Sequence, residues 1–138
     1  MATFEEVQRA REMMHRLHAE TLRMVELLEA EPLWQIRKEL SEPMYSQFAE
    51  VERTVEANMA ALANNQAALA EAEGKQPDQN ETLDEKSARE ERWAREIASA
   101  NKAGESGVTL RELLRQLING LRSSRGAPPI PEGGSSSN

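Results

Sequence analysis

The sequence predicts an all-α protein: a long antiparallel helical hairpin extended to a small bundle of three or four helices, with a disordered C-terminal tail. Three observations support this fold. Alanine, glutamate, leucine, arginine and glutamine dominate, and aromatic residues make up only 4% of the chain, as is typical of helices. Apolar residues recur every three or four positions over long stretches, which indicates amphipathic helices. Prolines and glycines separate these stretches, and helices commonly end at such residues.

Length and charge narrow the class of protein. The 138 residues suit one domain with a short tail. A net charge of −7 disfavours nucleic acid as a partner, because its phosphates would be repelled. The absence of cysteine excludes disulfides, thiolate metal sites and cysteine nucleophiles. The N-terminus is acidic, so we expect no signal peptide. No apolar run is long enough to predict a membrane span. We therefore expect a cytoplasmic protein, or one inside a particle assembled in the cytoplasm.

The first helix is expected over about residues 3–31. Thr3 and Glu6 form a capping-box pattern at its start. Its apolar positions follow a heptad repeat, which predicts a seam buried against another helix. The seam residues are Val7, Ala10, Met14, Leu17, Thr21, Met24 and Leu28. Pro32 and Pro43 then bracket a short helical elbow, about residues 33–41, with a small apolar face of its own.

The second long helix is expected over about residues 43–73, capped by Ser41 or Glu42. Its length matches that of the first helix, which favours an antiparallel hairpin. Half of residues 57–72 are alanine, so we expect good burial only as far as Val55. Buried asparagine can fix helix register or partner choice, and we therefore predict two partner-binding asparagines. The seam residues are Met44, Phe48, Val51, Val55, Asn58, Leu62, Asn65 and Leu69.

The last part of the bundle is expected to hold two further helices, about residues 82–102 and 109–125. Thr82 with Glu85 and Thr109 with Glu112 are capping-box patterns at their starts. The first of them is highly charged and should contribute to the core only around Trp93. Glycines at 104 and 107 predict a break between the two helices. The bundle then comprises residues 1–125, and residues 126–138, rich in proline, glycine and serine, form a flexible tail.

A leucine-rich face on the helix of residues 109–125 is the main candidate binding surface. Its start, Leu-Arg-Glu-Leu-Leu, matches a pattern of helices that insert into apolar grooves of partner proteins. The alternative is that this face closes the core of the bundle. The residues are Leu110, Leu113, Leu114, Leu117, Ile118 and Leu121.

The only metal-like pattern is Glu12-x-x-His15, with His18 one turn further on. Glu-x-x-His on a helix is half of the carboxylate-bridged di-iron pattern of ferritin-like bundles. The pattern occurs once, and the chain has no other histidine, so a site would need a second chain. We predict no cofactor and keep a metal-binding bundle as the alternative.

The sequence contains no catalytic constellation. No serine lies in a strand–turn–helix elbow, and the glycines form no phosphate-binding loop. We therefore expect a non-enzymatic helical interaction or assembly protein. It would be a small structural subunit or adaptor of a larger complex, for example a phage or other particle, and would bind a protein partner or a second copy of itself.

Overall fold

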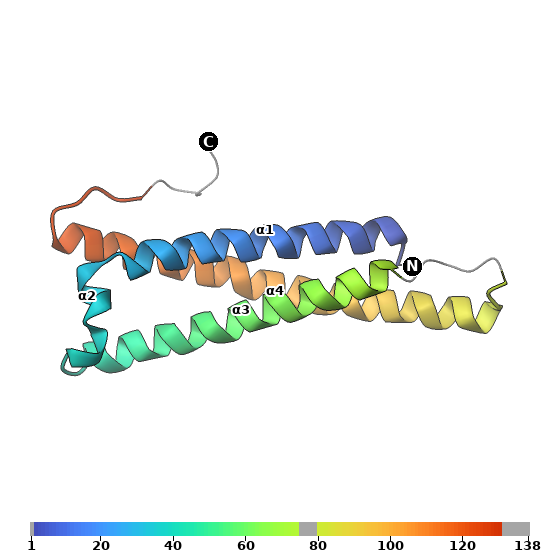
Figure 1. Ribbon diagram of the computed structural model, residues 1–138, viewed down its shortest axis with the longest axis horizontal. Helices are drawn as coiled ribbons and strands as arrows, with labels where there is room; N and C mark the ends of the chain where they lie inside the picture. Colours follow the sequence, from blue (N-terminus) through green and yellow to red (C-terminus); the bar gives the residue numbers. More distant parts are fainter. Residues whose placement is uncertain (1, 75–79, 131–138) are drawn as a thin grey trace.

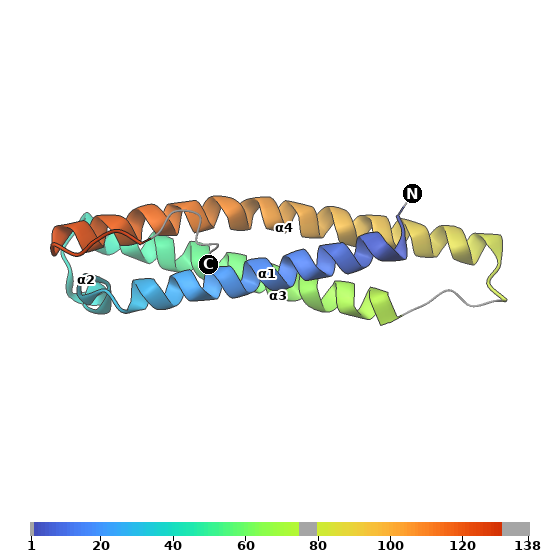
Figure 2. The same ribbon diagram turned by 90° about the horizontal axis from the view of Figure 1, so that it is seen from above.

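The computed structural model describes residues 2–74 and 80–130, which form helices and no strands. Three long helices lie side by side: α1 (Phe4–Glu29), α3 (Met44–Gly74) and α4 (Leu83–Ser124). As Figure 1 and Figure 2 show, α1 and α4 run in the same direction and α3 runs against both. The short helix α2 (Pro32–Gln35) and the 3-10 turn η1 (Arg37–Glu39) join α1 to α3. The predicted all-α bundle with an antiparallel hairpin is confirmed. We call the end at α2 the elbow end and the opposite end the open end.

Helix α1 forms as the sequence predicts. Its capping box is complete, because the Glu6 amide donates to Thr3 Oγ1 over 3.2 Å and the Thr3 amide donates to Glu6 Oε1 over 2.8 Å. The predicted seam residues are the buried residues of α1: Val7, Ala10, Met14, Leu17, Thr21, Met24 and Leu28. The seam is therefore covered by α3 and α4 of the same chain.

The elbow is held by an aromatic contact. The Trp34 ring is buried and lies 5.3 Å from the Phe48 ring between centroids. The Arg37 guanidinium lies 4.6 Å from the centroid of Trp34, a favourable cation–π arrangement. Helix α3 begins just beyond, where the Glu42 carboxylate accepts the Ser46 amide over 3.0 Å. The predicted elbow and the predicted cap at Glu42 are both present.

The second half of α3 is better buried than we expected. Leu62 and Leu69 are fully buried and Ala72 nearly so, whereas Val55 is only half-buried. The expectation of good burial only as far as Val55 is therefore wrong. Leucines in this half belong to one cluster with residues of both α1 and α4, so alanine neighbours do not leave them exposed.

Helix α4 is continuous, and the expected break at Gly104 to Gly107 is wrong. A single helix replaces the predicted pair at 82–102 and 109–125. Its capping box at Thr82 and Glu85 is complete. The capping box expected at Thr109 does not form, because Thr109 lies mid-helix and its hydroxyl donates to the Glu105 carbonyl over 3.1 Å.

The helix continues through the two glycines because both lie on the side of α4 that packs against α1 and α3. A Cβ added to Gly104 would lie 3.4 Å from side-chain carbons of Leu17 and Met14, and one added to Gly107 would lie 3.6 Å from Asn58 Oδ1. Glycine in a helix costs roughly 1 kcal/mol relative to alanine. Burial of a continuous α4 against α1 and α3 outweighs that cost, since tertiary packing supplies most helix stability in proteins.

The buried residues form two apolar clusters, one toward each end. The open-end cluster contains Val7, Ala10, Met14, Leu17, Leu62, Leu69, Ala72, Trp93, Ala100 and Ala103. The elbow-end cluster contains Met24, Leu28, Trp34, Phe48, Leu110, Leu114, Ile118 and Leu121. Across the described residues, no helix is both long enough and apolar enough to cross a membrane.

The chain turns back after α4. Gly126, with φ of +77°, ends the helix, as predicted, because glycine adopts this backbone conformation without steric cost. The Ile130 amide then donates to Asn119 Oδ1 over 2.8 Å, and the Ile130 side chain packs against the elbow-end cluster. The first residues of the predicted tail are therefore placed along α4, and residues 131–138 lie outside the described part of the chain.

Replacing Gly120 by alanine is expected to stabilise the protein by about 0.5–1 kcal/mol, because alanine favours the helix. Gly120 is exposed, and a Cβ there would have no neighbour within 4 Å. Urea unfolding followed by circular dichroism measures the change. The matched control is Gly126→Ala, which is expected to destabilise because φ is positive there. Equal effects at both sites would contradict the described end of α4.

Candidate functional site

The predicted leucine face lies mostly inside the bundle. Its residues Leu110, Leu114, Ile118 and Leu121 are buried in the elbow-end cluster, and Leu117 is half-buried against it. Leu113 alone among the six is exposed, at 44%. The buried members cannot enter the groove of another protein while this fold is intact. Their burial agrees with the second interpretation of the sequence, in which this face closes the core of the bundle.

The two predicted partner-binding asparagines face the protein itself. Asn58 is buried opposite Gly107, and the Asn58 Oδ1 atom has no hydrogen-bond partner among the described residues. Asn65 is half-buried, and its Nδ2 donates to the Ala61 carbonyl over 2.8 Å. Neither side chain is presented to a partner in the single chain.

The candidate metal ligands lie on the surface of α1. Glu12 and His15 are exposed and His18 is half-buried. The Nδ1 atom of His15 lies 3.0 Å from Nε2 of Gln66 on α3. Among residues 2–74 and 80–130, no group of three or more histidine or carboxylate side chains could hold a metal ion. Within these residues, the fold therefore adds no third ligand to the Glu12–His15 pair.

A shallow groove runs between α3 and α4 near Leu113. It is open to solvent and encloses about 320 Å³. Its lining consists of Thr54, Glu105, Ser106, Thr109, Leu110 and Leu113. The lining thus combines hydroxyl groups and the Glu105 carboxylate with two leucine side chains.

An uncharged outward face on α3 is the feature that sequence reasoning missed. The residues on this face are exposed: Ala57, Ala60, Ala63, Asn64 and Ala67. No charged residue occurs between Glu56 and Glu71, although 30% of the chain is charged. The gap in charge was visible in the sequence. Only the packing of α3 shows that these alanines point away from the core, because the opposite face carries Leu62 and Leu69.

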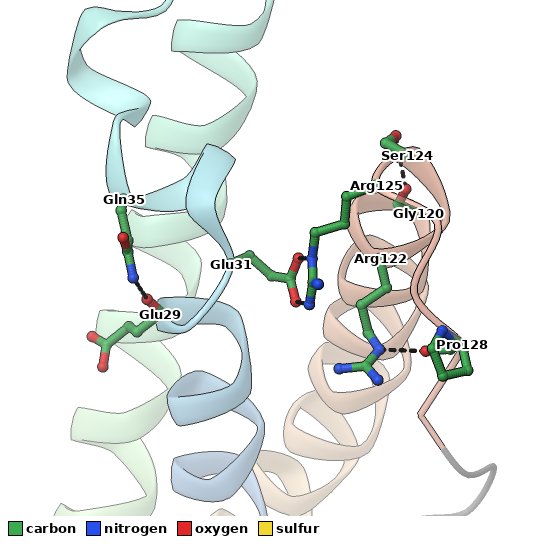
Figure 3. Close-up of polar contacts among 8 residues, drawn as sticks. All are labelled: Glu29, Glu31, Gln35, Gly120, Arg122, Ser124, Arg125 and Pro128. Atoms are coloured by element: carbon green, nitrogen blue, oxygen red, sulfur yellow. Dashed lines mark hydrogen bonds and ion pairs between the residues drawn. The ribbon is translucent and has the colours of Figure 1, made fainter.

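An ion pair between buried Glu31 and partly exposed Arg125 closes the elbow end (Figure 3). The Glu31 side chain is 2% exposed, and its two carboxylate oxygens accept Nε and a terminal nitrogen of Arg125 over 2.8 and 2.9 Å. These hydrogen bonds lower the pKa of Glu31 against the opposing effect of burial, and the charges of Arg125 and Arg122 lower it further. The pair ties the end of α4 to the turn between α1 and α2. It is a structural contact at the elbow.

Acid is expected to weaken the fold through this pair. Because the pKa of Glu31 is lower in the folded state, its contribution is fully present above the ordinary value of 4.5. It is lost as the pH falls through the folded-state value. Glu31→Gln should therefore flatten the dependence of unfolding free energy on pH below about 4.5. Urea titrations from pH 3 to pH 7 measure this slope. Glu29→Gln, at an exposed position nearby, is the control, and equal slopes in both variants would contradict the expectation.

The chain matches no protein-family model, no curated protein and no solved structure.

Proposed function

We propose that the protein is a non-enzymatic interaction or assembly protein, a small structural subunit or adaptor, whose α3 face packs against a second copy of the chain. The observation that carries this proposal is the exposed, uncharged face of α3. Small side chains let two helix backbones approach to about 8 Å. No charged side chain of this face would lose its water when a partner helix packs against it, so the contact has no such desolvation cost.

The charges at the ends of this face favour a second copy over an unrelated partner. Arg53, Ala60, Asn64, Ala67 and Glu71 share one side of the helix at helical spacing. The row is nearly symmetric about residue 62. If two copies of α3 pack antiparallel about that point, Arg53 of each copy lies beside Glu71 of the other. The side chain of Arg53 is 66% exposed, in a surface pair with Glu50, and Glu71 is exposed.

Two other apolar faces that the sequence suggested as contact surfaces are largely covered within one chain, which supports the same choice. The α1 seam and most of the leucine face are buried within one chain. A partner is therefore not needed to cover them. Assembly through α3 would leave the three-helix core intact, as a subunit of a larger complex such as a particle requires.

Mass measurements by light scattering and sedimentation test the proposal. We expect a reversible dimer at micromolar to millimolar concentration. Ala60→Arg should weaken the dimer at least about tenfold without changing the helix content, because it places a charge in the contact. Ala19→Arg, on the exposed side of α1, is the matched control and should leave the dimer unchanged.

A charge swap tests the antiparallel geometry. Arg53→Glu should weaken the dimer because it places like charges together, and adding Glu71→Arg in the same chain should restore it. A strictly monomeric wild-type protein would overturn the proposal. Failure of the double variant to recover would overturn the antiparallel arrangement.

A further inference from the structure

A polar layer crosses the middle of the bundle. Each long helix contributes one residue to it: Thr21 from α1, Asn58 from α3 and Gly107 from α4. Along each helix, this residue lies between the two apolar clusters. On the open-end side, the next core residues are Leu17 on α1, Leu62 on α3 and Ala103 on α4. On the elbow-end side, they are Met24, Val55 and Leu110. The apolar core is therefore interrupted at the same point in all three helices.

One contact and one ion pair across the bundle place the three residues within about one helical turn of the same level. A Cβ on Gly107 would lie 3.6 Å from Asn58 Oδ1. The residue before Thr21 is Glu20, which forms an ion pair with Arg111, one turn beyond Gly107. Thr21 thus lies within about one helical turn of the contact between Gly107 and Asn58.

The layer weakens the core where it crosses. Thr21 is fully buried and Asn58 is 8% exposed, and neither Thr21 Oγ1 nor Asn58 Oδ1 has a hydrogen-bond partner within the described residues. A buried polar atom without a partner shifts a folding equilibrium toward the open state by about tenfold or more. Gly107 adds no side chain that would bridge the two clusters.

The two clusters are unequal. In the open-end cluster, Ala10, Ala72, Ala100 and Ala103 are four of the ten buried residues. Every buried residue of the elbow-end cluster has a large side chain, and nine half-buried apolar residues pack around it, against five at the open end. Stability from burial grows with apolar area, so the elbow-end cluster is the more stable one.

We infer that the Thr21–Asn58–Gly107 layer divides the bundle into two units that open separately, with the open-end unit opening first. The open-end unit comprises residues 4–17, 62–74 and 83–103, and the elbow-end unit comprises residues 24–55 and 110–124. Opening would expose the apolar residues Val7, Met14 and Leu69 while the elbow stays folded. The inference does not depend on the proposed dimer.

Native-state hydrogen exchange tests the division directly, because amides that open together share one opening free energy. We expect core amides of the open-end unit to exchange at least about tenfold faster than those of the elbow-end unit. Exchange of both units at one common rate, governed by global unfolding, would overturn the inference.

The two tryptophans provide a second readout. Trp93 lies in the open-end cluster and Trp34 in the elbow-end cluster. Trp34→Phe leaves Trp93 as the reporter, and Trp93→Phe leaves Trp34. In urea, the Trp93 signal should change at a lower concentration than the Trp34 signal, since coincident transitions indicate a single cooperative unit. Coincident midpoints in the two variants would overturn the inference.

If apolar side chains replace Thr21 and Asn58, the two units should open together. In Thr21→Val with Asn58→Leu, exchange of the open-end amides should slow by about tenfold or more and approach that of the elbow-end amides. The matched control is Thr109→Val with Asn101→Leu, at exposed positions of α4, which should leave the difference in exchange rate between the two units unchanged. If Asn58→Leu prevents folding, Thr21→Val alone serves, because valine and threonine have the same shape. If the two units still differ in exchange rate by the same factor in the Thr21→Val, Asn58→Leu variant, the inference is overturned.

Discussion

Replacing Leu114 by glutamate is expected to unfold the bundle, whereas the same substitution at the neighbouring Leu113 leaves it folded. Leu114 is fully buried and Leu113 is 44% exposed. Truncation of a buried leucine to alanine alone costs about 2–5 kcal/mol. A carboxylate at the same place must also be desolvated without a partner, which exceeds the stability of most small domains.

Thermal unfolding followed by circular dichroism distinguishes the two variants. Leu114→Ala provides the graded version of the change, with an expected loss of about 2–5 kcal/mol. Leu113→Glu should shift the free energy of unfolding by less than about 0.5 kcal/mol, as for most surface changes. A Leu114→Glu protein that melts like the wild type would mean that the leucine face docks outward on a partner, against the described fold.

Truncating Trp34 to alanine is expected to cost about 3–5 kcal/mol of stability. The ring is 4% exposed, contacts Phe48 and lies under the Arg37 guanidinium. Its loss removes the side chain that joins the elbow to the start of α3. Urea unfolding at neutral pH measures the change.

Tyr45→Ala is the matched aromatic control for Trp34→Ala. Tyr45 lies near the same end of the bundle but is 44% exposed, so its truncation should cost less than about 1 kcal/mol. Equal costs for the two changes would show that the elbow is not anchored by Trp34.

The sequence favours the leucine face of residues 110–121 as the binding surface, whereas the structure favours the uncharged face of α3. This difference has a physical reason. A leucine at helical spacing predicts a buried face but does not state which surface buries it. The face of residues 110–121 meets α1, α3 and the elbow in the same chain. An alanine stretch carries no comparable signal, because alanine occurs equally on surfaces and at close helix contacts. The candidate face on α3 was therefore recognisable only after its opposite side had been assigned to the core.

The predicted helix break at Gly104 to Gly107 is wrong for a related reason. Local preference makes glycine a helix breaker, and a prediction from local pattern placed a loop there. Yet Ala100, Ala103, Gly104, Gly107 and Leu110 continue one inward face at helical spacing, and all are buried. Treating glycine as a small residue on a packing face would have joined the two predicted helices.

The helical class, the caps at Thr3 and Thr82, the seam of α1 and the end of α4 at Gly126 follow from local patterns in the sequence. These features depend on interactions within a few residues or on the periodicity of a single helix. Three features depend on the packing of the helices: α4 is one helix, Leu114 is core while Leu113 is surface, and Thr21, Asn58 and Gly107 lie at about the same level. Each of those outcomes depends on how three helices align along their length, because burial is a property of neighbours distant in the sequence.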